Sequence, residues 1–201
     1  MRLNVFRAAL FAFGLTVTGT AAIAHEFTAA IFVTGDNRES RLAEAVNGFL
    51  LAADERDGHP AETSDGHLGG VDVQVLPLPA EAAGRVVGLT GSPQSSPDVL
   101  VVMGSETLTS ATLSEFGFDG VLIHTGALPD NWATEDAPGS FAARYRSAYG
   151  TAPTEAAAQG YNAARRLDAA IRPLDGISPR RALETSLADT VDGINWMEDT
   201  R

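Results

Sequence analysis

Apolar runs along the chain predict four short β-strands. Residues 29–33 and 99–103 are continuously apolar, which is typical of strands buried on both faces of a parallel sheet. Residues 71–78 begin by alternating valine with polar side chains, which indicates a strand near the edge of a sheet. A further apolar run covers residues 121–124. These segments together predict a mainly parallel sheet.

Apolar residues that recur about every 3.6 positions predict helices between these strands. The first helix is expected over residues 38–56, and Asp36 and Glu39 have the spacing of a capping box at its start. The backbone N–H groups there could instead hold an anion or a ligand carboxylate, but a capping carboxylate satisfies the same donors. A short helix is also expected over residues 80–87.

The strand at 99–103 ends in a glycine, and Ser105 or Thr107 is expected to cap the helix that follows. That helix runs to about residue 116 and is closed by Gly117. The alternation of strands and helices predicts an α/β fold. We expect a three-layer αβα domain with a mainly parallel sheet of about four to five strands.

Residues 141–171 predict two helices separated by a break. Gly150 ends the first helix, Pro153 prevents an early restart, and Thr154 is expected to cap the second. One face of the second helix is apolar apart from Asp168, and small side chains on it would let the helix lie close against a sheet. The residues of that face are Ala157, Ala158, Tyr161, Ala164, Leu167, Asp168 and Ile171. A last helix, capped at Ser178-Pro179, is expected to end at Leu187.

The first 24 residues have the pattern of a secretory signal peptide. Arg2 and Arg7 form a basic start, and the apolar stretch at 8–17 is too short to span a bilayer. Ala22-Ile23-Ala24 matches a cleavage site. We therefore expect a periplasmic protein, soluble after cleavage, with a single α/β domain over residues 25–201. An uncleaved anchor is the alternative.

Composition narrows the classes of function. The formal charge is −12, and removal of the two arginines of the signal peptide makes it −14. Such an acidic chain is repelled by phosphates, so no nucleic acid is expected as a partner. The chain has no cysteine, which excludes disulfides, thiolate catalysis and a lipid anchor on cysteine. All the basic side chains are arginine, which we attribute to genomic base composition.

The order of residues in 141–171 resembles one family. The stretch reads F-x-x-x-Y-x-x-x-Y-G, then a nearby proline, and then G-Y-N-A-A-R-x-L-x-x-A-I. This order is similar to the late helices of type I periplasmic solute-binding proteins. That family is leucine-binding-protein-like and serves branched-chain amino acid ABC transporters. Two further features are similar to this family. One is the stretch D-V-L-V-V-M-G-S-E-T-L-T-S-A-T-L, which is followed by V-L-I-H-T-G-A-L. The other is the turn at Gly69-Gly70 before a strand. The resemblance implies a module linked to uptake of amino acids or other small solutes, with a membrane permease or another periplasmic protein as partner.

Proteins of that family have two α/β lobes that close on the ligand, whereas the predicted strands here suffice for one lobe. The late helices follow directly after the last predicted strand. The resemblance therefore implies a one-lobe relative in which ligand binding is weakened or lost, because a half-cleft buries less of a ligand.

The resemblance places ligand-binding residues in two loops at the carboxyl ends of strands, where open α/β sheets bind their ligands. The candidates in the first loop are Ser105, Thr107 and Thr109. The candidates in the second loop are Thr125, Gly126 and Ala127. Helix capping is the alternative role for Ser105 and Thr107.

No catalytic motif is present, so the protein is not expected to be an enzyme and neither catalytic residues nor a cofactor are assigned. One alternative function is an accessory or interaction protein without a ligand of its own. Another is a copper-binding protein that uses the mature N-terminal His25. That site would need a second histidine, from His59, His67 or His124. Residues 57–70 are otherwise expected to form a solvated loop.

Overall fold

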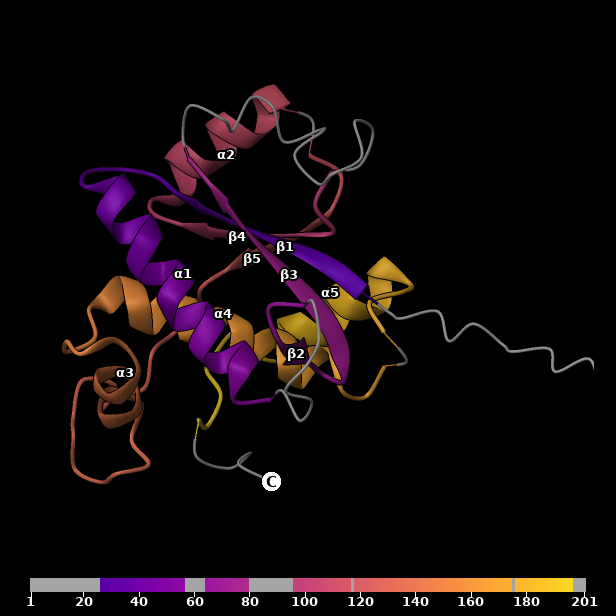
Figure 1. Ribbon diagram of the computed structural model, residues 1–201. Helices are drawn as coiled ribbons and strands as arrows, with labels where there is room; N and C mark the ends of the chain where they lie inside the picture. The colour runs from indigo at the N-terminus through magenta and orange to yellow at the C-terminus, as the bar shows by residue number, and fades with distance from the viewer. Residues whose placement is uncertain (1–25, 57–63, 80–95, 117, 175, 197–201) are drawn as a thin grey trace, which may run out of the picture.

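The structure is a computed structural model that describes residues 26–56, 64–79, 96–116, 118–174 and 176–196. It has an α/β architecture built around a sheet of five strands (Figure 1). The predicted signal peptide, the predicted helix at 80–87 and Gly117 lie outside the described residues, as do His25 and His59.

The sheet is mixed and mostly parallel, with the strand order β2-β3-β1-β4-β5. The parallel strands are β1 (Glu26–Val33), β3 (Val71–Leu78), β4 (Val99–Met103) and β5 (Val121–His124). All four were predicted, although β1 begins at residue 26 instead of 29. A short antiparallel strand, β2 (His67–Leu68), forms within the segment that was expected to be a loop. Two residues are too few to give a periodic signal in the sequence.

Helices cover both faces of this sheet (Figure 1). The helices are α1 (Arg38–Asp54), α2 (Glu106–Phe116), α3 (Phe141–Tyr149), α4 (Glu155–Ile171) and α5 (Arg180–Ala188). Successive side chains of β1 enter two separate hydrophobic cores, one on each face of the sheet. Ile31 belongs to the core on the side of α1 and α4. Phe32 belongs to the core on the side of α2. This division confirms the α/β arrangement predicted from the sequence.

The predicted cap of α4 at Thr154 is present, and α3 has a similar cap at Ser140 that was not predicted. The hydroxyls of Ser140 and Thr154 accept hydrogen bonds from Ala143 N and Ala157 N, at 3.3 and 3.2 Å. Gly150 closes α3 with a left-handed backbone at φ 75°. The last helix differs slightly from the prediction, because it has no side-chain cap at its start and ends at Ala188.

The predicted capping box at the start of α1 is wrong. The N-cap residue is Asn37, which has a left-handed backbone at φ 52°, and no side chain caps this helix. Asp36 therefore lies one position before the cap, so Asp36 and Glu39 do not have the spacing of a capping box. The sequence favoured Asp36 because a carboxylate is a good cap, whereas the helix start is set by the turn at Gly35 and Asn37.

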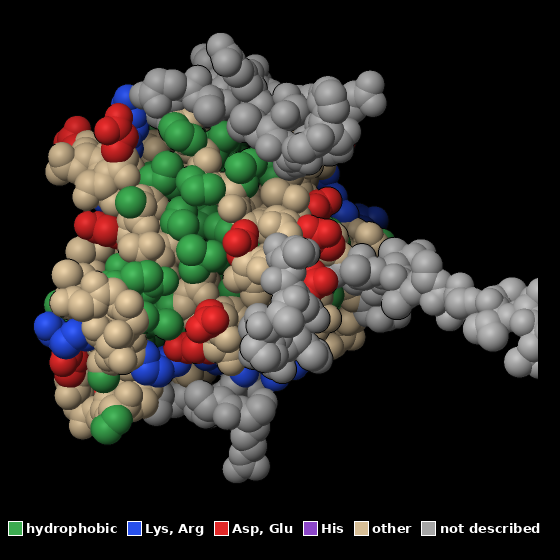
Figure 2. All heavy atoms as spheres, in the orientation of Figure 1, with side chains coloured by type: hydrophobic (Ala, Val, Ile, Leu, Met, Phe, Trp, Pro, Cys, Tyr) green, Lys and Arg blue, Asp and Glu red, His purple; other side chains and the backbone are tan. Residues whose placement is uncertain are grey.

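The outer edge of β3 has few free hydrogen-bond donors. Its start is paired with β2, and Val75 N donates to Asp65 Oδ2 at 2.7 Å. Pro77 has no N–H group to offer. Hydrophobic side chains nevertheless gather on the face of the molecule that extends from α2 to α1 (Figure 2). The outward N–H groups of Val73 and Val75 are bonded and Pro77 has none, which protects this edge against pairing with another strand.

The backbones of α1 and α4 touch through glycines. A Cβ atom added to Gly160 would lie 2.0 Å from Ala45 O, and one added to Gly48 would lie 1.9 Å from Ala157 O. The small side chains of α4 were expected to bring this helix close to the sheet. The structure places its tightest approach against α1 instead.

Asp168, the polar residue on the apolar face of α4, connects this helix to the turn between β2 and β3. Its side chain is 2% exposed, and Oδ1 accepts a hydrogen bond from Gly69 N at 2.8 Å. Oδ2 forms ion pairs with Arg172 at 2.6 Å and Arg56 at 3.3 Å. The buried carboxylate is therefore compensated by partners from three different segments.

The glycine contact leads to a first prediction. Gly160→Ala is expected to lower the free energy of unfolding by about 1–3 kcal/mol, because the added methyl group forces α1 and α4 apart. Helix propensity alone would change stability in the opposite direction, by about 1 kcal/mol. Urea unfolding of the purified protein measures the difference. Gln159→Ala, in the next position of the same helix, serves as the control and should change stability by less than about 0.5 kcal/mol.

Candidate functional site

The first predicted loop lies at the carboxyl end of β4, where Ser105 acts as a helix cap. Its hydroxyl accepts a hydrogen bond from Leu108 N at 3.3 Å. Thr109 is buried at 1% exposure and donates its hydroxyl to Ser105 O at 2.9 Å. Thr107 is exposed on the first turn of α2. Two of the three candidate hydroxyls in this loop therefore already have partners within the protein.

The second predicted loop follows β5 and is held by α4. Asn162 Nδ2 donates to Thr125 O at 2.6 Å and to Ala127 O at 3.2 Å. Gly126 has a left-handed backbone at φ 72°, and a Cβ atom there would lie 2.7 Å from Arg166 Nη1. The loop thus follows the surface of α4 closely, and two of its carbonyl groups bind a protein side chain.

A groove lies at the carboxyl end of β1, beside the uncapped start of α1. Its volume is about 450 Å³. It is lined by Phe32, Val33, Thr34, Gly35, Asp36, Arg38 and Leu108. None of the six candidate ligand-binding residues is among them, so the structure does not bring those candidates together around this groove.

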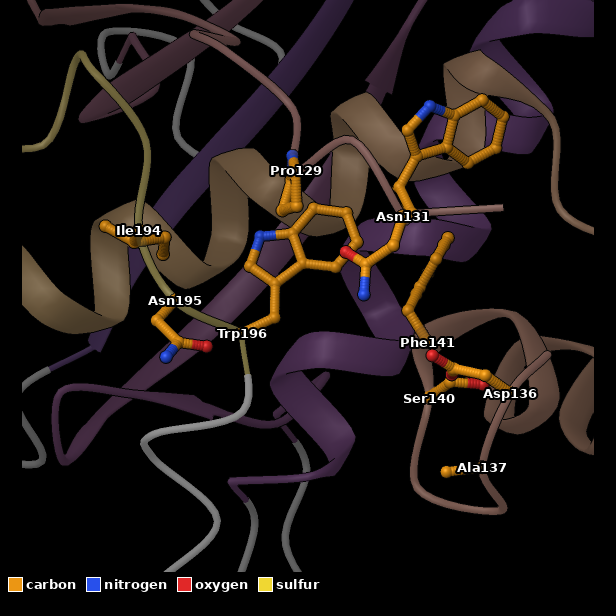
Figure 3. Close-up of a pocket in the computed structure, with 10 residues that line it drawn as sticks. Pro129, Asn131, Asp136, Ala137, Ser140, Phe141, Ile194, Asn195 and Trp196 are labelled. Atoms are coloured by element: carbon orange, nitrogen blue, oxygen red, sulfur yellow. The ribbon is translucent and has the colours of Figure 1, made fainter. Parts of the chain in front are cut away.

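A different pocket, of about 380 Å³, lies between the segment that follows β5 and the end of the described chain (Figure 3). We call it the aromatic pocket. It is lined by Pro129, Asn131, Trp132, Asp136, Ala137, Ser140, Phe141, Ile194, Asn195 and Trp196. Figure 3 shows the Trp196 ring at its centre, with Pro129 and Phe141 around it. Both tryptophans of the protein line this pocket.

Buried polar side chains of α4 fix the position of Trp196. The indole Nε1 donates to Asn162 Oδ1 at 2.9 Å, and Asn162 itself is fully buried. Arg165 donates to Trp196 O at 3.2 Å. The Trp196 ring lies edge-on to Phe141 and to Tyr161, with ring centroids 5.1 and 4.9 Å apart. This side of the pocket is therefore preorganised by hydrogen bonds and by aromatic packing.

Behind this wall, Tyr161 is the centre of a polar network. Its hydroxyl donates to Glu55 at 2.8 Å and accepts a hydrogen bond from Arg144 at 2.9 Å. Arg144 also forms an ion pair with Glu55. Burial of the Tyr161 hydroxyl, together with the nearby carboxylate of Glu55, raises the pKa of Tyr161 above its ordinary value of 10.0.

Arg166 joins α4 to the end of the sheet and to α5. It donates to His124 O, to Thr190 Oγ1 at 2.9 Å and to Leu187 O at 3.3 Å. These partners are uncharged, and burial lowers the pKa of Arg166. The bonds hold the chain on the path that leads from α5 to Trp196.

The polar groups around the aromatic pocket are neutral or acidic, since no lysine or arginine is among the residues that line it. Asp136 supplies a carboxylate, and Asn131 and Asn195 supply amide groups. The Ser140 hydroxyl is occupied as the cap of α3. The pocket can therefore hold a small molecule by ring contacts and a few polar interactions.

The described part of the chain has no group of three or more His, Asp or Glu side chains placed to hold a metal ion. His67 Nε2 contacts Asp72 Oδ1 at 2.6 Å beside the β2 edge of the sheet, whereas His124 ends β5 at the opposite edge. Four strand spacings of about 4.8 Å separate those edges, so the two histidines cannot share one ion.

Sequence reasoning did not assign a ligand site to the residues around the aromatic pocket, although Phe141, Tyr161 and Asn162 were part of the pattern that is similar to the family. Asn162, Arg165 and Arg166 lie off the face of α4 that was predicted to be buried, yet all are buried. Trp196, in an acidic stretch near the end of the sequence, was a further signal, because such a large apolar side chain is costly to expose.

Comparisons of the chain with models of protein families, with curated proteins and with solved structures found no match. Within the described residues, no helix combines the length and the apolar composition needed to cross a membrane.

The network around Tyr161 leads to a second prediction. Folded Tyr161 keeps its proton to a higher pH than the unfolded chain does, so the folded state binds more protons above about pH 10. The free energy of unfolding should therefore fall as the pH rises through and above about 10, by at most about 1.4 kcal/mol per pH unit for one group. Urea unfolding at a series of pH values measures this slope.

Tyr161→Phe should make the fall shallower, while Tyr145 and Tyr149, whose pKa values are also raised by burial, sustain part of it. A slope that the substitution leaves unchanged would contradict the assignment to Tyr161.

Proposed function

We propose that the protein is an exported solute-binding module, a one-lobe relative of the type I periplasmic solute-binding proteins, and that its ligand site is the aromatic pocket. The observation that carries the proposal is a cavity of about 380 Å³ with rings on its walls and one wall fixed by buried hydrogen bonds. That volume lies near the lower end of the range for small-molecule sites, which begins at about 300 Å³.

The residues that carry the resemblance to the family also build this pocket. Phe141, from the start of the F-x-x-x-Y pattern, lines it directly. Tyr161 and Asn162, from G-Y-N-A-A-R, pack against Trp196 or bind its indole N–H. The sequence pattern of the late helices therefore supports the same site as the geometry does.

The loop residues implied by the resemblance are less suited to a ligand. Ser105 and Thr109 bond to α2 and to each other, and the carbonyls of Thr125 and Ala127 bond to Asn162. A ligand at the carboxyl edge of a single lobe would also be exposed on one side. The aromatic pocket has walls from two segments of one chain, so it can surround a ligand without a second lobe.

The predicted signal peptide over residues 1–24 supports a periplasmic place of action. In that setting the module would deliver a small solute to a membrane permease or to another periplasmic protein. Its predicted role is binding, with no catalytic step and no cofactor.

Ligand binding can be measured by intrinsic fluorescence, because both tryptophans of the protein line the pocket. We expect at least one member of a panel of amino acids, small carboxylates, alcohols and amines to change the emission saturably and to raise the melting temperature. At a hundredfold excess over its Kd, a ligand stabilises the folded state by about 2.7 kcal/mol.

Trp132→Ala removes one wall of the pocket and should abolish the response, while Leu108→Ala, in the groove at the end of β1, should not. Circular dichroism of both variants verifies that they fold. The opposite result would move the ligand site to the carboxyl edge of the sheet. A panel without any response would contradict the proposed function.

A further inference from the structure

We propose that the aromatic pocket selects an organic cation, such as a small quaternary ammonium ion or amine, over neutral and anionic molecules of the same shape. This inference rests on the proposed function of the pocket as a ligand site. Rings and a carboxylate line the pocket together, and no basic side chain is among its lining residues.

The first argument is the aromatic character of the walls. Trp132, Phe141 and Trp196 all line the cavity. A cation within about 6 Å of the centre of an aromatic ring is attracted by the negative face of the ring, most strongly for tryptophan. The lining of the pocket contains two rings of the most favourable kind.

The same aromatic cluster already attracts cations on its inner side. The guanidinium carbon of Arg144 lies 5.4 Å from the centre of the Tyr161 ring, and that of Arg165 lies 6.0 Å from it. Tyr161 in turn packs against both Phe141 and Trp196. The arginines are held there by Glu55 and by Trp196 O, so a ligand cation would meet the outer side of the cluster.

The second argument is the charge of Asp136. This carboxylate lines the pocket and forms no ion pair with a described cation. The neighbouring Glu135, in contrast, is paired with Arg146 at 2.6 Å. Asp136 is exposed, so water screens its charge, and we expect it to contribute modestly to affinity and mainly to the preference for cations.

The start of α3 also reaches the pocket and would by itself favour an anion. Its cap is already formed, however, because Ser140 Oγ accepts the hydrogen bond from Ala143 N. The acidic balance of the whole chain, −12 in total, adds a general attraction for cations. The amide group of Asn131 is neutral and can accept an N–H bond from an amine.

The test compares choline with 3,3-dimethylbutan-1-ol, which has the same shape but carries a carbon atom in place of the charged nitrogen. Isobutyrate provides a small anion. Fluorescence titration of the purified protein should give a saturable response to choline and at least about tenfold weaker binding of the alcohol and of isobutyrate. Trp132→Ala should abolish the response to choline.

Asp136→Asn should weaken choline binding by about two- to fivefold and leave binding of the alcohol unchanged. Asp130→Asn makes the same change of net charge in the same loop outside the pocket, and it should leave both affinities unchanged.

The outcomes separate this inference from the proposed function. Equal affinity for choline and the alcohol would overturn the preference for cations, and so would tighter binding of isobutyrate. If Trp132→Ala abolishes that binding, the pocket still stands as a ligand site. A response to choline that survives Trp132→Ala would place the cation elsewhere and overturn the inference. Failure of these probes and of the wider panel would overturn both.

Discussion

The close contact between the backbones of α1 and α4 is the constraint on which the rest of the structure depends. Gly48 and Gly160 allow each helix to touch a carbonyl oxygen of the other, at Ala157 and Ala45. Because α1 packs on β1 and β3, this contact fixes α4 relative to the sheet. The polar side chains that α4 carries on its other sides are thereby held at fixed positions.

Those polar side chains explain how one helix organises segments that are far apart in the chain. Asn162, Arg165, Arg166 and Asp168 are all buried, and an unpaired buried polar group is costly. Asn162 bonds to the loop after β5 and to Trp196, and Arg165 also bonds to Trp196. Arg166 bonds to the end of α5, and Asp168 bonds to the turn before β3. The aromatic pocket forms where two of these regions meet.

The sequence predicted the four parallel strands and the five described helices well, because each is encoded by a local pattern of apolar residues and caps such as Thr154. It did not predict β2, the N-cap of α1 at Asn37, or the aromatic pocket. β2 is too short to leave a pattern, and the left-handed N-cap of α1 is a feature of the local backbone. The pocket depends on contacts over long separations, such as the 34 positions between Asn162 and Trp196. Residue types alone do not reveal which buried polar group will meet which segment.

The position of the aromatic pocket bears on how the proposed one-lobe module could bind a ligand. At the carboxyl edge of the sheet, a one-lobe protein has one wall and leaves its ligand open to water. The pocket instead lies between the chain that leaves β5 and the segment that returns after α5, and Asn162 bonds to both. A ligand there would be enclosed by elements that α4 holds together. In the one-lobe module that we propose, the segment after α5 would thus take the place of a second lobe.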